Sequence, residues 1–263
     1  MELETDDPEK QYYIGKSFIE GVDNYPVDIS KGVQYLESSI EQKCVDSGIY
    51  YSKMLLKGIH VQKNIEKAKK ILDIFLDYNN SDIFLLYGEL KIEEQNFNES
   101  IEYFKKSSQM GNIQSTRKLG QIFRRGEGVE PNKIEALNYF KIAADQGDTI
   151  SITEYGEMLQ AGEGIPSNIK EAVRYYKMGA DLGDPNAMNH YAISLRDGLG
   201  IDADIKESFR YFKLSADKGN IGAMNDCGIM FFNGFGTEIN YEKAADYLKM
   251  AADKGSTIGM RNY

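Results

Sequence analysis

The two histidines, His60 and His190, are the residues of this sequence best suited to metal binding or to proton transfer near neutral pH. Neither histidine has a second histidine or a cysteine near it in the sequence. With only two cysteines in the chain, no zinc-binding pattern is possible. We therefore expect no metal site and no catalytic histidine, and we expect both side chains to lie on the surface or in helix packing.

Glycine-rich phrases, such as residues 126–128 and 162–164, resemble loops that hold phosphate groups. Those loops follow a strand and precede a lysine with a serine or threonine, whereas these phrases end an amphipathic stretch and lack that pair. Carboxylates such as Glu163 and Asp181 recur at a fixed spacing or lie in turns, so no pair stands out for acid–base catalysis. We predict no catalytic residue, no cofactor and no enzyme activity.

A repeat of 36 residues governs the sequence from Gly111 onward. Four successive steps end in the similar phrases KIAADQG, KMGADLG, KLSADKG and KMAADKG, which close at Gly147, Gly183, Gly219 and Gly255. Each unit has two amphipathic stretches around a connector, as in residues 151–160, AGEGIPSN and residues 169–180. A helical hairpin of this size cannot bury both apolar stripes alone, so we predict an all-α, right-handed superhelical solenoid of stacked helix-turn-helix repeats.

The apolar residues of each unit fall at helical spacing, as Ile152, Tyr155 and Leu159 do in one first stretch. Tyrosines that recur on the second stretch are expected in the core and not as a platform for bases: Tyr139, Tyr175, Tyr211 and Tyr247. Small residues, which would let two helices cross closely, recur on the first stretch: Gly120, Gly156, Ala192 and Gly228. Left-handed caps are predicted at Gly126, Gly162, Gly198 and Gly234, and helix starts at Asn132, Asn168, Asp204 and Asn240.

Upstream of Gly111 the repeat continues in degenerate form, with Lys43 and Asn79 in place of closing glycines and His60 in place of a connector glycine. We expect a disordered acidic tail at residues 1–10 and six units in residues 11–255. Counting the first as degenerate, the approximate ranges are 11–43, 44–79, 80–111, 112–147, 148–183, 184–219 and 220–255. Residues 256–263 would be a partial repeat or cap, or the point at which a longer protein was cut.

Composition limits the kinds of partner. The net charge is -10 and the pI is about 4.9, which disfavours binding to nucleic acid and is compatible with a basic partner or with simple solubility. The N-terminus has no apolar segment typical of a secretory signal, and no run of 18 apolar residues occurs. Cys44 and Cys227 lie about five repeats apart, so a disulfide between them is not expected. We expect a cytoplasmic protein without a membrane span.

The phrases LGQIFRRGEGV, YGEMLQAGEGI and CGIMFFNGFG, each followed by the alanine-rich phrases of the second stretch, resemble the Sel-one-like repeat family. This family is related to tetratricopeptide repeats and has a longer connector. The resemblance implies an all-helical superhelix that acts as an adaptor or scaffold for other proteins, in the cytosol or in the endoplasmic reticulum. It leaves open an adaptor in endoplasmic-reticulum-associated degradation, and a regulatory array of a larger protein, for example one fused to a kinase domain.

One face of the first helices is the predicted partner-binding surface. Residues two positions either side of Tyr155 point about 160 to 200 degrees away from the core, and in related folds this side is concave. The predicted partner-binding residues are Arg117, Gln121, Arg124, Glu157, Asn189, Arg196, Asn225 and Phe232, with Thr153, Ile193 and Ile229 on the same stripe. Arginine and asparagine there could bind the backbone and carboxylates of an extended peptide. The alternative interpretation is a merely solvated face.

Overall fold

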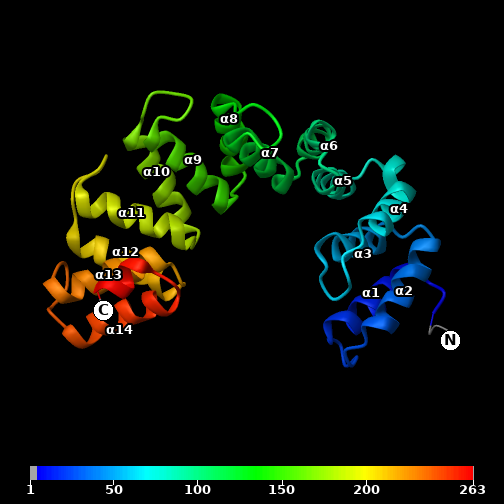
Figure 1. Ribbon diagram of the computed structural model, residues 1–263, viewed down its shortest axis with the longest axis horizontal. Helices are drawn as coiled ribbons and strands as arrows, with labels where there is room; N and C mark the ends of the chain where they lie inside the picture. The colour runs from blue at the N-terminus through cyan, green and yellow to red at the C-terminus, as the bar shows by residue number, and fades with distance from the viewer. Residues whose placement is uncertain (1–4, 263) are drawn as a thin grey trace. The chain divides into compact units, whose positions relative to one another are not determined.

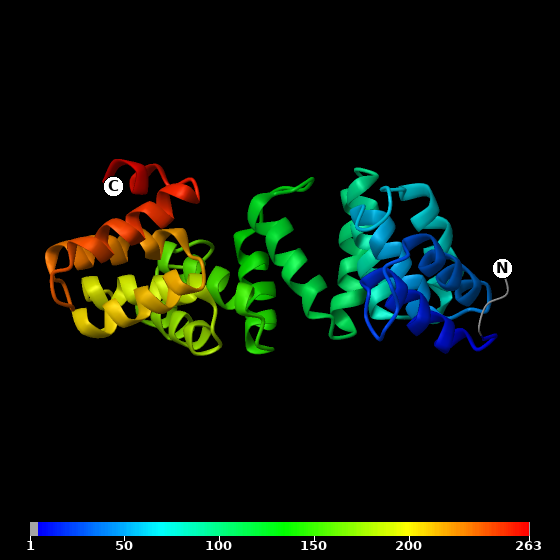
Figure 2. The same ribbon diagram turned by 90° about the horizontal axis from the view of Figure 1, so that it is seen from below.

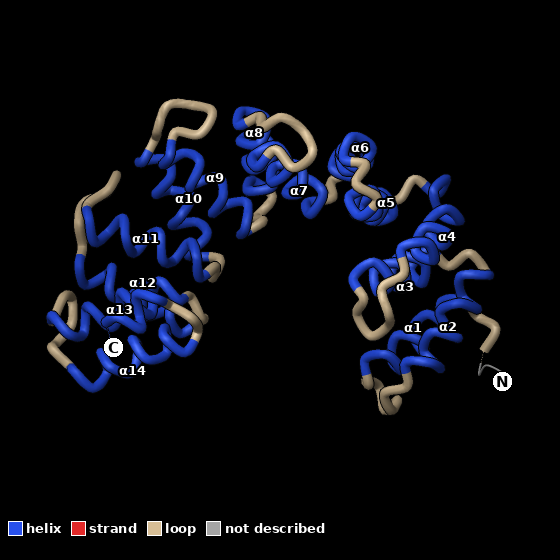
Figure 3. The backbone as a smooth tube through the Cα atoms, viewed as in Figure 1, coloured by secondary structure: helices blue, strands red, loops and turns tan. Residues whose placement is uncertain are grey.

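The computed structural model describes residues 5–262, and every regular element among them is helical (Figures 1 and 3). The first helices of the hairpins are α1 (Pro8–Glu20), α3 (Val45–Lys57), α5 (Ser81–Glu93), α7 (Ile113–Arg125), α9 (Thr149–Ala161), α11 (Pro185–Asp197) and α13 (Ile221–Asn233). The second helices are α2 (Ile29–Glu41), α4 (Ile65–Phe75), α6 (Phe97–Gln109), α8 (Lys133–Asp145), α10 (Ile169–Asp181), α12 (Ile205–Asp217) and α14 (Tyr241–Asp253). A short 3-10 helix, η1 (Leu76–Tyr78), follows α4, and α15 (Thr257–Asn262) comes last.

The chain divides into two compact units, Met1–Pro131 and Asn132–Tyr263. Within the N-terminal unit, α1, α3 and α5 pack against the helices that follow them, and each second helix packs against the next first helix. The C-terminal unit repeats this order from α8 to α15 (Figures 1 and 2). The predicted all-α fold of consecutively packed helical hairpins is therefore confirmed.

Among residues 5–262, seven first helices are each followed by a second helix, one pair more than the six units expected from the sequence. The degenerate first stretch forms a full hairpin, because Gly15 and Gly32 let α1 and α2 approach closely. A β-carbon on Gly15 would lie 2.9 Å from the carbonyl oxygen of Gly32. After the seventh pair, α15 occupies the place of another first helix and packs against α14.

The first helix begins at Pro8, inside the segment expected to be a disordered tail. Asp7 caps it by accepting hydrogen bonds from the backbone amides of Glu9 and Lys10, and proline stands in the first turn, where its missing N–H does no harm. Residues 8–10 thus belong to α1, and residues 1–4 of the expected tail lie outside the described residues.

The turns follow the predicted chemistry. Gly162 ends α9 with φ of 72°, and the equivalent glycines at 126, 198 and 234 are also left-handed. Asn168 then caps α10 by accepting from the backbone amide of Glu171. In the degenerate units non-glycine residues adopt the left-handed conformation instead, and His60 is one of them, with φ of 61°. His60 is therefore an exposed connector residue.

Within each unit, the core lies between helices that are neighbours in the chain. Ile152, Tyr155 and Leu159 are buried as predicted. Of the four tyrosines predicted in the core, Tyr175 and Tyr211 are buried, whereas Tyr139 and Tyr247 are only half-buried. The fully enclosed rings stand one position later on the second helices: Phe104, Phe140, Tyr176 and Phe212.

Candidate functional site

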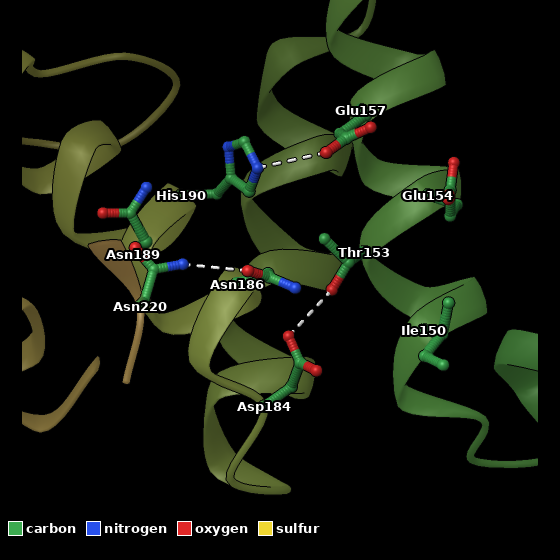
Figure 4. A pocket seen from close by; sticks show the side chains of 9 residues that line it. All are labelled: Ile150, Thr153, Glu154, Glu157, Asp184, Asn186, Asn189, His190 and Asn220. Carbon is green, nitrogen blue, oxygen red and sulfur yellow. Dashed lines mark hydrogen bonds and ion pairs between the residues drawn. The ribbon is translucent and has the colours of Figure 1, made fainter. Parts of the chain in front are cut away.

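An open groove of about 300 Å³ lies on the first helices of the C-terminal unit. It is lined by Ile150, Thr153, Glu154, Glu157, Asp184, Asn186, Asn189, His190 and Asn220, which come from α9, α11 and the caps of α11 and α13 (Figure 4). Two of the predicted partner-binding residues, Glu157 and Asn189, are among them. We call this the asparagine groove.

The groove is set by contacts between one first helix and the next. The Nε2 atom of His190 on α11 lies 3.2 Å from Oε1 of Glu157 on α9, as Figure 4 shows. The imidazole also stacks on the ring of Tyr176 with centroids 4.8 Å apart. His190 is therefore a packing residue in the wall of the groove, as the sequence led us to expect.

The floor of the groove is tied to the start of α11. Thr153 is buried, and its hydroxyl donates to the backbone oxygen of Thr149 and lies 3.2 Å from Oδ1 of Asp184 (Figure 4). The same Asp184 oxygen accepts from the backbone amide of Ala187 and so caps α11. Thr153 thus positions the cap of the next repeat and is not exposed on the predicted face.

Amide side chains give the groove its hydrogen-bonding capacity. Asn220 donates through Nδ2 to Oδ1 of Asn186 at 2.8 Å. The Oδ1 atom of Asn189 is shielded from solvent and has no hydrogen-bond partner among the described residues. An amide offers both donors and an acceptor, so this set can bind the N–H and C=O groups of a peptide backbone.

The guanidinium of Arg196 is held by ion pairs within the fold. Its guanidinium donates to Asp197 at 2.7 Å and, across to α13, to Asp226 at 2.9 Å. The hydrogen bond from Arg196 lowers the pKa of Asp197 below its ordinary range. Burial raises the pKa of Asp226, and the nearby arginine opposes that rise only in part.

Asn225 is inaccessible, in contrast to its place on the predicted stripe. It is 7% exposed and donates through Nδ2 to Oγ of Ser256 at 2.8 Å. Ser256 directly precedes α15, so the start of the next first helix covers this position. The start of the next repeat therefore buries a position that helical phase placed on the predicted stripe.

Phe232 lies at a separate, apolar hollow of about 290 Å³ that is lined by Ile229, Phe232, Asn233 and Leu248. Its ring is 56% exposed and meets Tyr241 edge-on with centroids 5.3 Å apart. The remaining predicted residues, Arg117, Gln121 and Arg124, are half-buried on α7 in the N-terminal unit. Both arginines already have partners. Within the C-terminal unit, the predicted stripe is therefore divided between the asparagine groove and this apolar hollow.

Five lining residues were missed by the sequence reasoning: Ile150, Glu154, Asp184, Asn186 and Asn220. Two of them, Asp184 and Asn220, are helix caps, and the pattern of Asp or Asn before each first helix could have revealed them. Asn186 lies on α11 and Glu154 on α9, beside the predicted stripe. The prediction included too few positions around each helix.

Among the described residues, no group of three or more histidine, cysteine or acidic side chains could hold a metal ion. Both cysteines are free thiols. No helix in residues 5–262 has the length and apolar character needed to cross a bilayer.

Solved structures share this fold. One is c5321, a protective antigen present in uropathogenic Escherichia coli strains that displays an SLR fold. It superposes on 97% of this chain with a TM-score of 0.81 and 21% sequence identity. A Sel1 repeat protein from Oxalobacter formigenes superposes with a TM-score of 0.80 and 21% sequence identity, and the match covers 97% of this chain and 75% of that protein. Yeast Tom70 gives 0.58 at 14% identity, with 97% of this chain and 53% of Tom70 covered. The chain spans 55% of the length of c5321.

No protein with a curated description matches the sequence. The pattern of the Sel1 repeat matches residues 9–44, 49–73, 83–112, 113–148, 150–184, 185–220 and 221–256, which makes seven repeats. These matches follow the seven helical hairpins and cover most of the sequence, so the chain belongs to the Sel1 repeat family.

Proposed function

We propose that this protein is a non-catalytic interaction scaffold whose C-terminal unit binds an extended peptide segment in the asparagine groove. Membership of the Sel1 repeat family and the tetratricopeptide-like fold support the general role of a protein-binding array. The observation that carries the specific proposal is the convergence of three asparagine side chains, Asn186, Asn189 and Asn220, on one groove of about 300 Å³.

The amides suit a peptide backbone because each presents donors and an acceptor at short reach. The shielded oxygen of Asn189 has no partner among the described residues, and a buried acceptor without a hydrogen bond costs about 1–3 kcal/mol. A small rotation of this amide toward the groove would let a peptide N–H satisfy it. Ile150 at the edge provides apolar contact for a side chain of the ligand.

The charge of the lining selects the ligand further. Glu154, Glu157 and Asp184 contribute carboxylates, and neither lysine nor arginine lines the groove. An acidic segment would be repelled here, whereas a neutral or basic segment would not. We infer a partner segment with neutral or basic side chains.

The proposal is tested by selecting peptides from a random display library against the whole chain and measuring their affinity by fluorescence anisotropy. Asn186→Ala and Asn189→Ala should each weaken selected peptides by about fivefold to tenfold, the loss expected for one or two hydrogen bonds. Asn138→Ala is the matched control, because Asn138 is an exposed asparagine on α8, a second helix of the same unit, and does not line the groove.

Selected peptides should also be neutral or basic in composition. Failure to select any peptide, or peptides whose affinity is the same for Asn186→Ala, Asn189→Ala and Asn138→Ala, would refute binding in the asparagine groove.

A further inference from the structure

A second groove, of different charge, lies on the first helices of the N-terminal unit. Two adjacent hollows of about 170 and 150 Å³ share Lys57 and Glu89 as lining residues. Together they are lined by Ile49, Lys53, Leu56, Lys57, Asp82, Leu85, Leu86, Glu89, Ile92, Glu93, Gln114 and Lys118, from α3, α5 and α7. We call this the lysine groove, and we propose that it binds an acidic peptide segment with aliphatic side chains.

The cations of this groove are unpaired. Lys53, Lys57 and Lys118 make no ion pair among the described residues. Some lysines elsewhere in the same unit do pair, as Lys67 does with Glu37 at 2.6 Å and Lys69 with Glu94 at 3.1 Å. The chain has an excess of ten acidic charges, yet three unpaired lysines surround this one groove. Carboxylates of a ligand would supply the missing partners.

The floor of the groove is apolar. Leu56, Leu85 and Leu86 form it and are between 3% and 8% exposed, while Ile49 and Ile92 are half-buried. Lysine stems also cover apolar surface while the ammonium group stays in water. A ligand that alternates carboxylates with aliphatic side chains would meet both the charged rim and this floor.

The acidic residues of the groove favour a peptide over a nucleic acid. Glu93 is held by Lys63 at 2.6 Å, and Asp82 accepts from Nδ2 of Asn112 at 2.9 Å. Glu89 lies between the two hollows and is available to accept a backbone N–H of a peptide. The phosphodiester backbone of DNA has no donor to offer these three carboxylates, whereas a peptide backbone has N–H groups, and the groove offers no aromatic side chain on which bases could stack.

This inference is independent of the asparagine groove, which belongs to the other unit and has no lysine or arginine in its lining. If both proposals hold, the chain carries two peptide sites that differ in charge preference. Either one can fail without the other.

The test uses a fluorescein-labelled peptide of alternating glutamate and leucine, with the whole chain as the binding protein. The comparison probes are the same peptide with lysine in place of glutamate, and a labelled single-stranded oligonucleotide. The groove variant is K53Q/K57Q/K118Q. Its matched control is K70Q/K213Q/K249Q, which removes three exposed lysines from second helices and so has the same net charge.

We expect the wild-type chain to bind the glutamate–leucine peptide more tightly than the lysine–leucine peptide, with an affinity that falls as ionic strength rises. The groove variant should weaken this binding on the order of tenfold, the effect of losing three partly exposed ion pairs. The control should bind like the wild type. Unchanged circular dichroism spectra would show that both variants are folded.

Three results would overturn the proposal. The first is absence of binding by the wild type, and the second is an equal loss of affinity in the groove variant and the control. The third is tighter binding of the oligonucleotide than of the acidic peptide, which would make the groove a nucleic-acid site.

Discussion

A β-carbon placed on Gly156 would lie 2.6 Å from Cε1 of Tyr176, so α9 and α10 touch through a bare backbone and the edge of a ring. The ring of Tyr176 has little room to move away from such a β-carbon. It is 1% exposed, its hydroxyl donates to Oε1 of Gln160, and His190 of the next repeat stacks on its face. The same contact recurs where Gly88 faces Phe104 and where Gly228 faces Leu248.

Gly156→Ala should therefore lower the free energy of unfolding. Forcing a methyl group into a filled core costs about 1–3 kcal/mol, which exceeds the gain of up to about 1 kcal/mol in helix propensity. Urea unfolding followed by circular dichroism measures the change. Shrinking the ring in Gly156→Ala/Tyr176→Leu should recover part of the loss, and a single variant as stable as the wild type would contradict this packing.

Much of the fold was predictable because its determinants are local. Helix periods, left-handed caps such as Gly162 and cap side chains such as Asn168 act within one hairpin, and they recur at a fixed step. The start of the first hairpin was harder to place, because Asp7 and Pro8 form a helix start inside an acidic stretch that also looks like a tail.

The site was less predictable because the next repeat decides which residues stay exposed. Helical phase places Thr153 and Asn225 on the face opposite the core of their own hairpin. The cap residue Asp184 then covers Thr153, and Ser256 covers Asn225. Charge pairing is equally non-local, since Arg196 finds Asp226 on the following first helix.

Ser52 occupies, in α3, the position that Gly156 has in α9, and its hydroxyl is buried without a hydrogen-bond partner among the described residues. Ser52→Ala should raise the free energy of unfolding by about 1 kcal/mol, because an unsatisfied polar group is removed from the core. Ser100→Ala is the control. The Ser100 hydroxyl donates to the backbone oxygen of Gly88 at 2.9 Å, so its loss should destabilise by about 1 kcal/mol. Effects of the same sign in both variants would argue against this difference.

The two thiols should differ in reactivity. Cys227 is fully buried, and burial raises its pKa to about 12, whereas Cys44 is partly exposed at the start of α3. Since the thiolate is the reactive form, only about one Cys227 in ten thousand would be ionised near pH 8. Brief treatment with iodoacetamide followed by mass spectrometry should find Cys44 modified and Cys227 intact. In denaturant both should react, and equal labelling of the folded protein would show that the core around Cys227 opens.

Asp226 and Asp197 share one arginine and should respond to pH in opposite ways. Burial raises the pKa of Asp226, so between the ordinary value of about 3.9 and the raised value the folded chain holds a proton that the unfolded chain has lost. The stability from the protonated carboxyl is complete below that window and is lost as pH rises through it. Asp226→Asn cannot titrate, so its stability relative to the wild type should increase as pH is raised from acid to neutral.

For Asp197 the hydrogen bond from Arg196 lowers the pKa, and the folded chain therefore releases its proton before the unfolded chain does. The resulting stability is present above the ordinary pKa and is lost as pH falls through the lowered one. Asp197→Asn should thus become less stable relative to the wild type as pH is raised. Urea unfolding of the three proteins across this pH range measures both differences. If the relative stability of Asp226→Asn fell as pH was raised, burial would not control the ionisation of Asp226.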